Sequence, residues 1–289
     1  MAGIGAREIK RRIRSVRNIE HITNAMKLVS AAKLRRAKTV FESTQKYLHY
    51  VTDSINELFN NVEEIQGHYL LGNREIKRTC YVVITSNRGL AGSFNANVIK
   101  AAERLMREGD EEPLLICVGS RGRDYFSKRE YEVLSEYHSP PESVSFVNTR
   151  GISKPVVTLF DEEGIDEVVI IYTAFLSSLE QRVQTKRLLP FDVKHDPETL
   201  RNEEQVDYEP SAEEVFNYLV HKYVEIMIYQ AIVESATCEH AARRLAMENA
   251  TDNAREMMDK LELHYNRARQ AAITREITEI VSGADAVGR

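Results

Sequence analysis

The chain has 289 residues, 43% of them hydrophobic and 29% charged, and its formal net charge at pH 7 is −5. No run approaches the ~20 apolar residues that span a bilayer, and the N-terminus lacks the apolar core of a signal peptide, so we expect membrane association only through partners. Three isolated cysteines form no CxxC or Cys/His cluster, which favours reduced structural thiols over a metal or redox centre: Cys80, Cys117 and Cys238.

The first predicted element is one long helix within residues 1–67. Neither Gly nor Pro occurs between Gly5 and Gly67, a run of 61 residues, and both residue types are costly inside helices. In the second half, mostly apolar residues recur in steps of three and four, which is typical of a heptad seam: Phe41, Thr44, Leu48, Val51, Ile55, Leu58, Val62 and Ile65. In the first half we expect a less regular stripe: Ile9, Ile13, Val16, Ile19, Ile22, Met26 and Val29.

Residues 68–210 contain all seven prolines and have the pattern of an α/β domain. Short apolar segments at 81–84, 114–118 and 168–172 are typical of buried strands, and a helix is expected at about 95–107. Alternation of such strands with helices predicts a parallel, Rossmann-like sheet. Residues 181–189 alternate in polarity, which predicts an edge strand that forms a hairpin with the third of these strands.

The last predicted element is a helix within residues 211–289, because no Gly or Pro occurs between Pro210 and Gly283, a run of 72 residues. Ser211 and Glu214 have the spacing of an N-terminal capping box. The early apolar face contains Val215, Leu219, Ile226 and Val233. Further along, alanines predict close approach of a second helix: Ala236, Ala242, Ala246, Ala250, Ala254, Ala268 and Ala271.

Two helices of this length would measure about 90 and 108 Å at ~1.5 Å per residue, too long for a compact domain to cover. Periodic helices far beyond ~25 residues imply a coiled coil when a membrane span and a repeat are excluded. The expected fold is therefore mixed α/β: a long antiparallel coiled coil of the N- and C-terminal helices with an inserted Rossmann-like α/β domain.

Motifs for catalysis, metal binding and nucleotide binding are missing from the sequence. The turns at 87–92 and 119–122 follow strands, where Rossmann-like folds bind phosphates, but neither forms GxGxxG and no GxxxxGK[ST] occurs. The eight histidines show no metal-binding spacing, and no GxSxG is present. We therefore expect no catalytic residue, no metal ligand and no cofactor.

Basic residues are concentrated at one end of this acidic chain. Residues 1–38 hold eleven Lys and Arg against two Glu, which gives +9, whereas residues 211–289 hold nine basic and thirteen acidic residues, which gives −4. A basic helical arm fits an acidic protein surface or RNA. The arm lacks interleaved aromatic residues and glycines, which favours a protein partner. An RNA-binding protein with a basic coiled-coil arm is the alternative, and an enzyme that binds a nucleotide in the α/β domain is a third hypothesis.

Three segments carry a resemblance that periodicity does not supply: ITNAMKLVSAAKL at 22–34, ITSNRGLAG at 84–92, and ATDNA at 250–254 followed by YNRARQAAITREITEIV at 265–281. Together they resemble the gamma subunit of F-type ATP synthase, of the bacterial type, and the resemblance covers essentially the whole chain.

The resemblance implies a non-catalytic central-stalk rotor that couples ion-driven rotation to ATP synthesis or hydrolysis on the beta subunits. Its coiled coil would enter the ring of three alpha and three beta subunits, and its α/β domain would contact the epsilon subunit and the c-ring of Fo. The chain would then lie peripherally on the cytoplasmic face of the cell membrane and bind no nucleic acid.

The resemblance also implies particular contact residues. Arg269 and Gln270 match polar contacts with a loop of the beta subunit, and Arg243, Thr274 and Glu276 match neighbouring positions involved in coupling. On the N-terminal helix, the opposing segment contains Met26 and Lys27. Two departures from the family are visible: the cysteine-bearing insertion of chloroplast members is absent, and the stretch from Leu189 to Tyr208 is short.

Overall fold

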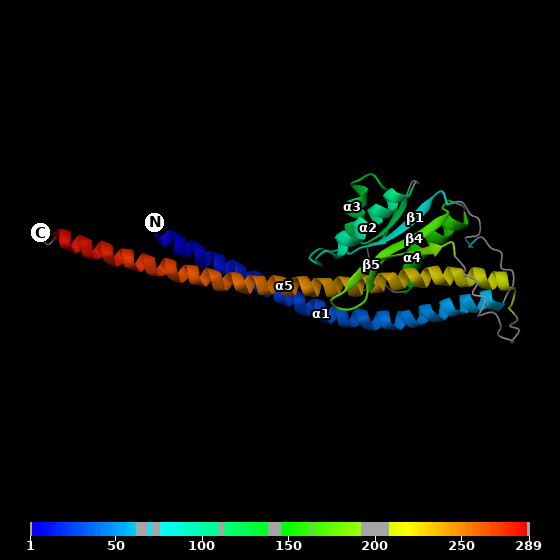
Figure 1. Cartoon of the computed structure of the whole chain (residues 1–289), viewed down its shortest axis with the longest axis horizontal. Coiled ribbons are helices and arrows are strands. Elements are labelled where there is room, and N and C mark those ends of the chain that lie inside the picture. The colour runs from blue at the N-terminus through cyan, green and yellow to red at the C-terminus, as the bar shows by residue number, and fades with distance from the viewer. Residues whose placement is uncertain are drawn as a thin grey trace. The chain divides into compact units, whose positions relative to one another are not determined.

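The structure is a computed structural model that describes residues 2–61, 69–70, 76–109, 113–137, 146–162, 164–191 and 208–287. The chain divides into two compact units, which are described separately. The coil unit consists of residues 1–30 and 244–289, and the α/β unit consists of residues 31–243. Two long helices contribute to both units (Figure 1): α1 (Ala2–Asn61) and α5 (Ala212–Val287).

Both long helices confirm the prediction drawn from the distribution of Gly and Pro. Gly3 and Gly5 lie inside α1, and Gly283 lies inside α5, so glycines near the ends do not stop either helix. At the start of α5, the Ser211 Oγ accepts a hydrogen bond from the Glu214 N–H at 3.2 Å, as the capping-box spacing predicts. No helix among the described residues has a stretch long and apolar enough to cross a membrane.

The α/β unit contains a five-stranded sheet in the order β3-β2-β1-β4-β5. All strand pairs are parallel except β4 with β5, which form the predicted antiparallel hairpin at one edge. The strands are β1 (Thr79–Ile84), β2 (Leu114–Val118), β3 (Glu132–Tyr137), β4 (Glu167–Phe175) and β5 (Gln181–Leu189). The helices between them are α2 (Phe94–Glu108), α3 (Ser120–Ser127) and α4 (Phe146–Asp161). No sequence pattern had predicted β3, α3 or α4.

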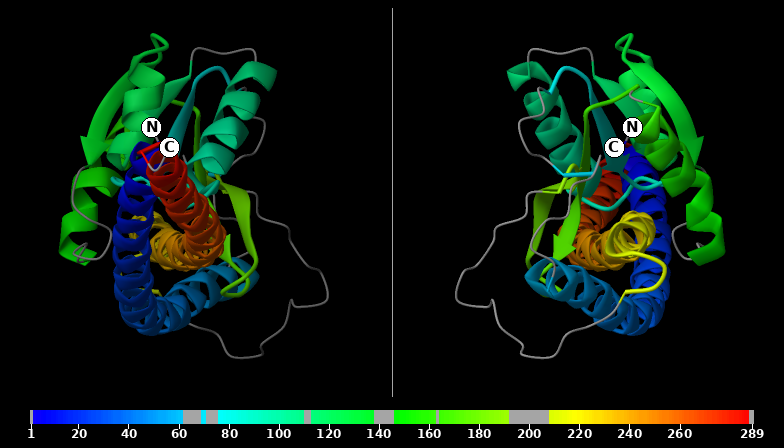
Figure 2. Two further views of the ribbon diagram at one scale, coloured as in Figure 1. Left: turned by 90° about the vertical axis from the view of Figure 1, so that its left-hand side faces the viewer. Right: turned by 90° about the vertical axis from the view of Figure 1, so that its right-hand side faces the viewer.

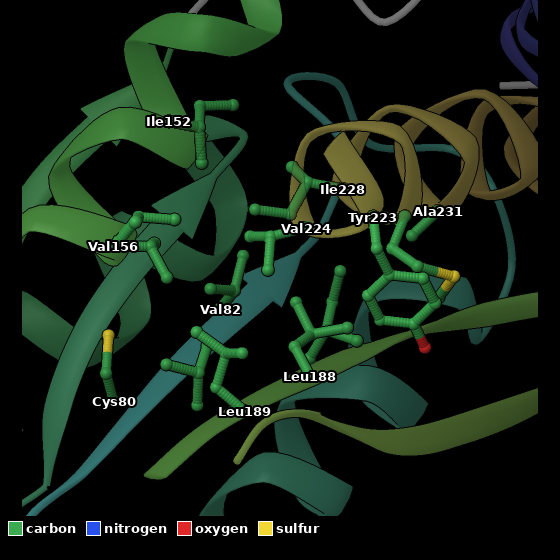
Figure 3. Close-up of a cluster of buried hydrophobic side chains, with 14 of the residues drawn as sticks. Cys80, Val82, Ile152, Val156, Leu188, Leu189, Tyr223, Val224, Ile228 and Ala231 are labelled. Atoms are coloured by element: carbon green, nitrogen blue, oxygen red, sulfur yellow. The ribbon is translucent and has the colours of Figure 1, made fainter. Parts of the chain in front are cut away.

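Helices cover both faces of this sheet. On one face, Val83 of β1 and Ile171 of β4 pack against α2 and α3, for example against Phe126. On the other face, Cys80 and Val82 alternate with the first set and pack against α4 and α5. Figure 3 shows this second core, with side chains of α4 and α5 converging on those of the strands: Ile152, Val156, Val224, Ile228, Val82 and Leu188. In the end-on views of Figure 2, α2 and α3 lie away from the yellow part of α5.

Side chains of α5 also complete the edge of β4. Pairing of β4 with β1 ends at Ile171, so the later backbone groups of β4 have no partner in β1. Ser235 Oγ accepts from the Thr173 N–H at 3.2 Å, and Cys238 Sγ donates to the Thr173 carbonyl at 3.4 Å. Glu234 Oε1 accepts from the Phe175 N–H at 2.9 Å. Because buried backbone groups need partners, these contacts fix the position of α5 along the sheet.

Within the α/β unit, α1 follows the predicted heptad seam. Phe41, Thr44, Val51, Ile55 and Leu58 are buried and Leu48 is half-buried, whereas Val62 and Ile65 lie outside the described residues. Val51, Ile55 and Leu58 belong to the same core as Phe216 and Val220 of α5. The Phe41 ring meets the Phe175 ring edge-on, with the centroids 6.3 Å apart.

In the coil unit, α1 and α5 run antiparallel. Thr251 Oγ1 donates to Thr23 Oγ1 at 2.8 Å, and the Arg255 guanidinium contacts the Glu20 carboxylate at 3.0 Å. One step further, Arg17 pairs with Glu262 at 3.5 Å. Residue numbers thus fall along α1 as they rise along α5. This confirms the antiparallel coiled coil.

The predicted stripe in the first half of α1 is only partly right. Ile19, Ile22 and Val29 are exposed by 49%, 60% and 55%. The other four residues of the predicted stripe, Ile9, Ile13, Val16 and Met26, are buried or half-buried. The seam that continues the heptad steps of the second half consists of Ile9, Ile13, Val16, Glu20, Thr23, Lys27 and Ser30. Polar residues can occupy this seam because they pair across it, as Thr23 and Glu20 do. Selecting apolar residues alone shifted the predicted stripe by one position from Ile19 onward.

The predicted alanine seam of α5 is also only partly right. In the α/β unit Ala236 is buried and Ala242 is half-buried. In the coil unit Ala254 is buried and Ala246, Ala250 and Ala268 are half-buried, but Ala271 is exposed. The inward positions again step by threes and fours: Met247, Thr251, Ala254, Met258, Leu261, Tyr265, Ala268 and Ala272. Large side chains at half of these positions make the pair less thin than the alanines alone predict.

Candidate partner-binding surface

Four of the proposed contact residues lie on the exposed C-terminal part of α5. Arg269, Gln270, Thr274 and Glu276 are all exposed, within the coil unit. The inward positions of α5 end at Ala272, and every residue from 273 to 282 is exposed. In Figure 1 the C-terminal end of α5 extends past the N-terminal end of α1. This segment is therefore a single helix with all its faces available to a partner.

Apolar side chains line one face of this single-helix segment. Ile273, Ile277, Ile280 and Val281 follow the i, i+4, i+7, i+8 spacing and are exposed by 47%, 56%, 66% and 55%. An unburied apolar stripe of this kind marks a site of interaction with another molecule. This spacing is readable in the sequence, but the stripe was not among the predictions.

Met26 and Lys27 occupy a different environment on α1. Both are half-buried, and Lys27 stands at a seam position, four residues after Thr23 and three before Ser30. Ile22, Leu28 and Val29 beside them are exposed by 60%, 62% and 55%. The heptad therefore places these apolar side chains off the seam, where they are exposed.

Arg243 is not on the same surface as the other proposed contact residues. It belongs to the α/β unit and is only 9% exposed. Its Nη2 contacts Glu239 Oε1, one turn earlier on α5, at 2.6 Å, and donates to the Gly89 carbonyl at 3.2 Å. The structure thus brings Arg243 together with the β1–α2 turn.

The place where a Rossmann-like sheet binds nucleotides is filled by protein. In the order β3-β2-β1-β4-β5, the chain reverses direction between β1 and β4, and ligands of such sheets bind at the carboxyl ends of the strands there. At that position Ala91 and Phe94 pack against Cys238 of α5, and all three are at most 5% exposed. A helix therefore occupies the crevice.

The first amides of α3 are also used internally. The Ser120 N–H donates to Asn87 Oδ1, and the Gly122 N–H donates to Thr85 Oγ1, both at 2.9 Å. Gly119 has φ +94°, and a Cβ there would lie 2.2 Å from the Thr85 carbonyl oxygen, so only glycine fits. As expected from the missing motifs, the glycines here serve tight strand–helix turns.

Comparison with known proteins identifies the family. A family model described as ATP synthase matches residues 5–287. The ATP synthase gamma chain of Alkaliphilus metalliredigens is 45% identical over 289 residues, which cover 99% of both chains. The chain belongs to the ATP synthase gamma-chain family. As a gamma chain it is the non-catalytic rotor subunit of the central stalk, which confirms the predicted function. The RNA-binding alternative finds no support.

Solved structures of ATP synthases share this fold. The match in the central stalk and c-ring of the Tetrahymena thermophila mitochondrial ATP synthase is 27% identical, with a TM-score of 0.64, and covers 79% of this chain and 99% of that one. A chain of the Euglena gracilis mitochondrial ATP synthase is 19% identical, with a TM-score of 0.73, and covers 99% and 95%. The second match shows the fold of nearly the whole gamma chain.

Burial raises the pKa of several structural groups in this gamma chain, among them two cysteines and a glutamate. All three cysteines are buried and outside any disulfide, and burial raises the pKa of Cys80 to about 12 and also raises that of Cys238. Burial raises the pKa of Glu234 to about 7, against the opposing effect of the Phe175 N–H. Because the thiolate is the nucleophilic form of cysteine, the two cysteines with a raised pKa are poor nucleophiles. No group of three or more potential metal ligands occurs among the described residues.

Proposed function

We propose that this rotor subunit turns inside a ring of three alpha and three beta subunits, and that the end of the coil unit is what the ring contacts. The proposed contacts are Arg269, Gln270, Thr274 and Glu276 on α5, with Met26 and Lys27 on α1. Residues 68–210 would form the domain that meets the epsilon subunit and the c-ring, between shaft helices at 1–67 and 211–289. The chain would then lie peripherally at the cytoplasmic face of the cell membrane.

The observation that carries this proposal is the bare end of α5. An isolated helix exposes backbone and side chains on every side, and most helical stability in proteins comes from packing of one face. Here four apolar side chains remain in water over residues 273–281. Burial of apolar surface is worth roughly 25 cal/mol per Å². A ring of subunits around this segment would bury the stripe and gain that free energy without fixing the helix at one rotational position.

Polar residues next to the stripe would make the interaction with the ring depend on the rotational position of the shaft, as a rotor requires. Arg269 and Gln270 are exposed and lie one turn before Ile273 and Thr274. A guanidinium makes charge-assisted hydrogen bonds to carboxylates, the stronger class of polar contact. A ligand shifts a conformational equilibrium only by binding one state better than another. A contact formed with one beta subunit at a time would meet this condition.

Reconstitution tests the proposal directly. The purified chain alone should show no ATP hydrolysis, because its nucleotide crevice is filled by α5. Mixed with alpha and beta subunits, it should elute with them as one complex that hydrolyses ATP. Turnover by the chain alone, or failure to elute with alpha and beta, would contradict the proposal.

A further inference from the structure

The helices α4 and α5 border a hollow in the α/β unit. Both helices bury side chains in the core shown in Figure 3, among them Ile152 of α4 and Ile228 of α5. Beside this contact they leave a space of about 560 Å³. Sites for small molecules typically measure ~300–1,000 Å³. The hollow shares no residue with the crevice that Cys238 of α5 fills, so it is a separate place in the fold.

One face of each helix lines the hollow, because the lining residues recur at steps of three, four or seven, which place side chains on one side of a helix. The charged and aromatic members of this lining are Arg150, Lys154 and Asp161 on α4, and Tyr218, Lys222 and Glu225 on α5.

One end of the hollow is fixed by a buried tyrosine. Tyr69 is 5% exposed, and its Oη donates to Asp161 Oδ1 of α4 at 2.5 Å. His221 Nε2 of α5 lies 2.8 Å from the same Oη. Because the single hydroxyl proton goes to Asp161, the imidazole Nε2–H is the donor in the second contact. The two helices are thus linked through Tyr69, and a preformed site of this kind loses less entropy when it binds a ligand.

The other end carries an excess of positive charge. Arg150 Nε and Lys222 Nζ both contact the Glu225 carboxylate, at 2.8 and 3.1 Å. Lys154, one turn after Arg150, is exposed and makes no ion pair with any residue that the structure describes. Apart from its histidine, the lining has three cations and two carboxylates. A hollow with a surplus cation favours an anionic ligand.

Hydroxyl groups and an aromatic ring complete the lining. Ser153 and Thr158 lie on the α4 side, and within the described part of the chain neither hydroxyl makes a hydrogen bond. On the α5 side Tyr218 is 63% exposed, and Lys222 Nζ lies 5.7 Å from the centre of its ring. The hollow therefore combines three available donors with an aromatic surface that an apolar group can cover.

We propose that this hollow binds a small organic phosphate monoester, with Lys154 on the phosphate and Tyr218 against the organic group. A phosphate monoester carries about −1.5 to −2 charges at pH 7 and presents three strong acceptor oxygens, which match Lys154 and the two hydroxyls. A carboxylate has only two oxygens and would leave one donor without a partner. The inference does not rest on the proposed function, because the ligand is bound by this chain alone.

Calorimetric titration of the purified full chain with AMP tests the proposal. AMP should bind, whereas adenosine, which lacks the phosphate, should not. Lys154→Gln should weaken the binding of AMP about tenfold or more, because it removes a hydrogen bond to a charged group. Tyr218→Ala should weaken it about two- to tenfold, the range expected for loss of one aromatic contact.

Lys128→Gln is the matched control. Lys128 follows α3, which covers the other face of the sheet; it is exposed and makes no ion pair among the described residues. The substitution removes the same charge, so the affinity for AMP should equal that of the wild type. Lys154, Tyr218 and Lys128 are all exposed, and matching circular dichroism spectra would verify that the three variants fold.

Three results would overturn the proposal: no binding of AMP to the wild-type chain, equal affinities of the wild type and Lys154→Gln, or equal losses in Lys154→Gln and Lys128→Gln. Sedimentation with vesicles that contain phosphatidylglycerol distinguishes a lipid headgroup from a free phosphate ester. A chain that sediments with these vesicles but does not bind AMP would also contradict the proposal, since the phosphate would then belong to a membrane surface.

Discussion

The same two helices form two very different interfaces. In the α/β unit, nearly every residue of α5 from Tyr223 to Ala241 is buried, between the sheet and other helices. In the coil unit, only every third or fourth residue of α5 from Thr251 to Ala272 turns inward, and the facing seam of α1 includes Glu20, Thr23 and Lys27. The difference separates two tasks along one helix. The first region supplies folding stability, and the second keeps most of its surface for partners.

The largest expected effect is a loss of stability in the α/β unit. Ile228 is fully buried among Val82, Val224 and other core residues, so Ile228→Ala should lower the free energy of unfolding by roughly 2–5 kcal/mol. Ile277→Ala, at a position 56% exposed, should change it by less than about 0.5 kcal/mol. Urea unfolding of the isolated chain measures both. Equal losses at the two sites would abolish the distinction between the regions.

The second effect depends on pH. Glu234 is buried in the α/β unit, and its pKa in the folded chain is about 7, above the ordinary 4.5. A raised carboxyl pKa means that the folded state holds its proton more tightly, so stability falls as pH rises from about 4.5 to 7. Glu234→Gln should therefore be more stable than the wild type at pH 8, by roughly 3 kcal/mol at most, and equal to it near pH 4.

The exposed Glu57→Gln is the control for this titration. Subtracting its effect at each pH isolates the contribution of the buried carboxyl. If the advantage of Glu234→Gln did not grow between pH 4 and pH 8, the carboxyl would not be held in the environment that the structure describes.

A smaller effect is expected at the polar seam of the coil unit. Thr23 and Thr251 are buried and hydrogen-bonded to each other across the helices at 2.8 Å. Thr23→Val should cost only about 0.5–1.5 kcal/mol, the net value of one hydrogen bond, because the Thr251 hydroxyl still donates to the Met247 carbonyl at 2.7 Å. Replacing both residues by Val should be close to neutral. Unfolding curves of the two variants test this. A double variant worse than the single one would show that the polar pair contributes stability of its own.

The smallest effect is expected from thiol chemistry. Because Cys80, Cys117 and Cys238 are buried and outside any disulfide, oxidation followed by dithiothreitol should leave the ATPase activity of the assembled complex unchanged. A several-fold response that disappears in a variant without cysteines would contradict this.

The sequence predicted the fold well where one signal dominated. The absence of Gly and Pro marked both long helices, and apolar runs marked β1, β2 and β4, which are buried on both faces. It failed where signals conflicted. Gly151 and Pro155 lie inside α4 and conceal it, and β3 exposes Leu134 by 39%, so it lacks a continuous apolar run. On α1, polar residues at Glu20 and Thr23 hid the true seam because their pairing partners are more than 200 residues away.

The candidate site depended on information of another kind. No periodicity in the sequence selects Arg269 or Gln270; the family resemblance does, and the structure places both on the exposed part of α5. Resemblance alone also grouped Arg243 with them, although its neighbours are Glu239 and Gly89 inside the α/β unit. Local contacts of that sort follow from tertiary packing, which a linear motif does not encode.

The ATPase rate of the assembled complex with single substitutions at the end of α5 tests the central claim most directly. Arg269→Ala and Gln270→Ala should each lower the rate while the chain still folds and assembles, because a contact that favours one state of its partner is lost. Arg267→Ala is the matched control, since Arg267 is exposed on the same turn but outside the proposed contacts. Arg255 would not serve, because it pairs with Glu20 of α1. A lower rate for Arg269→Ala and Gln270→Ala alone is the predicted result, and equal rates for all three variants at equal assembly would contradict the account.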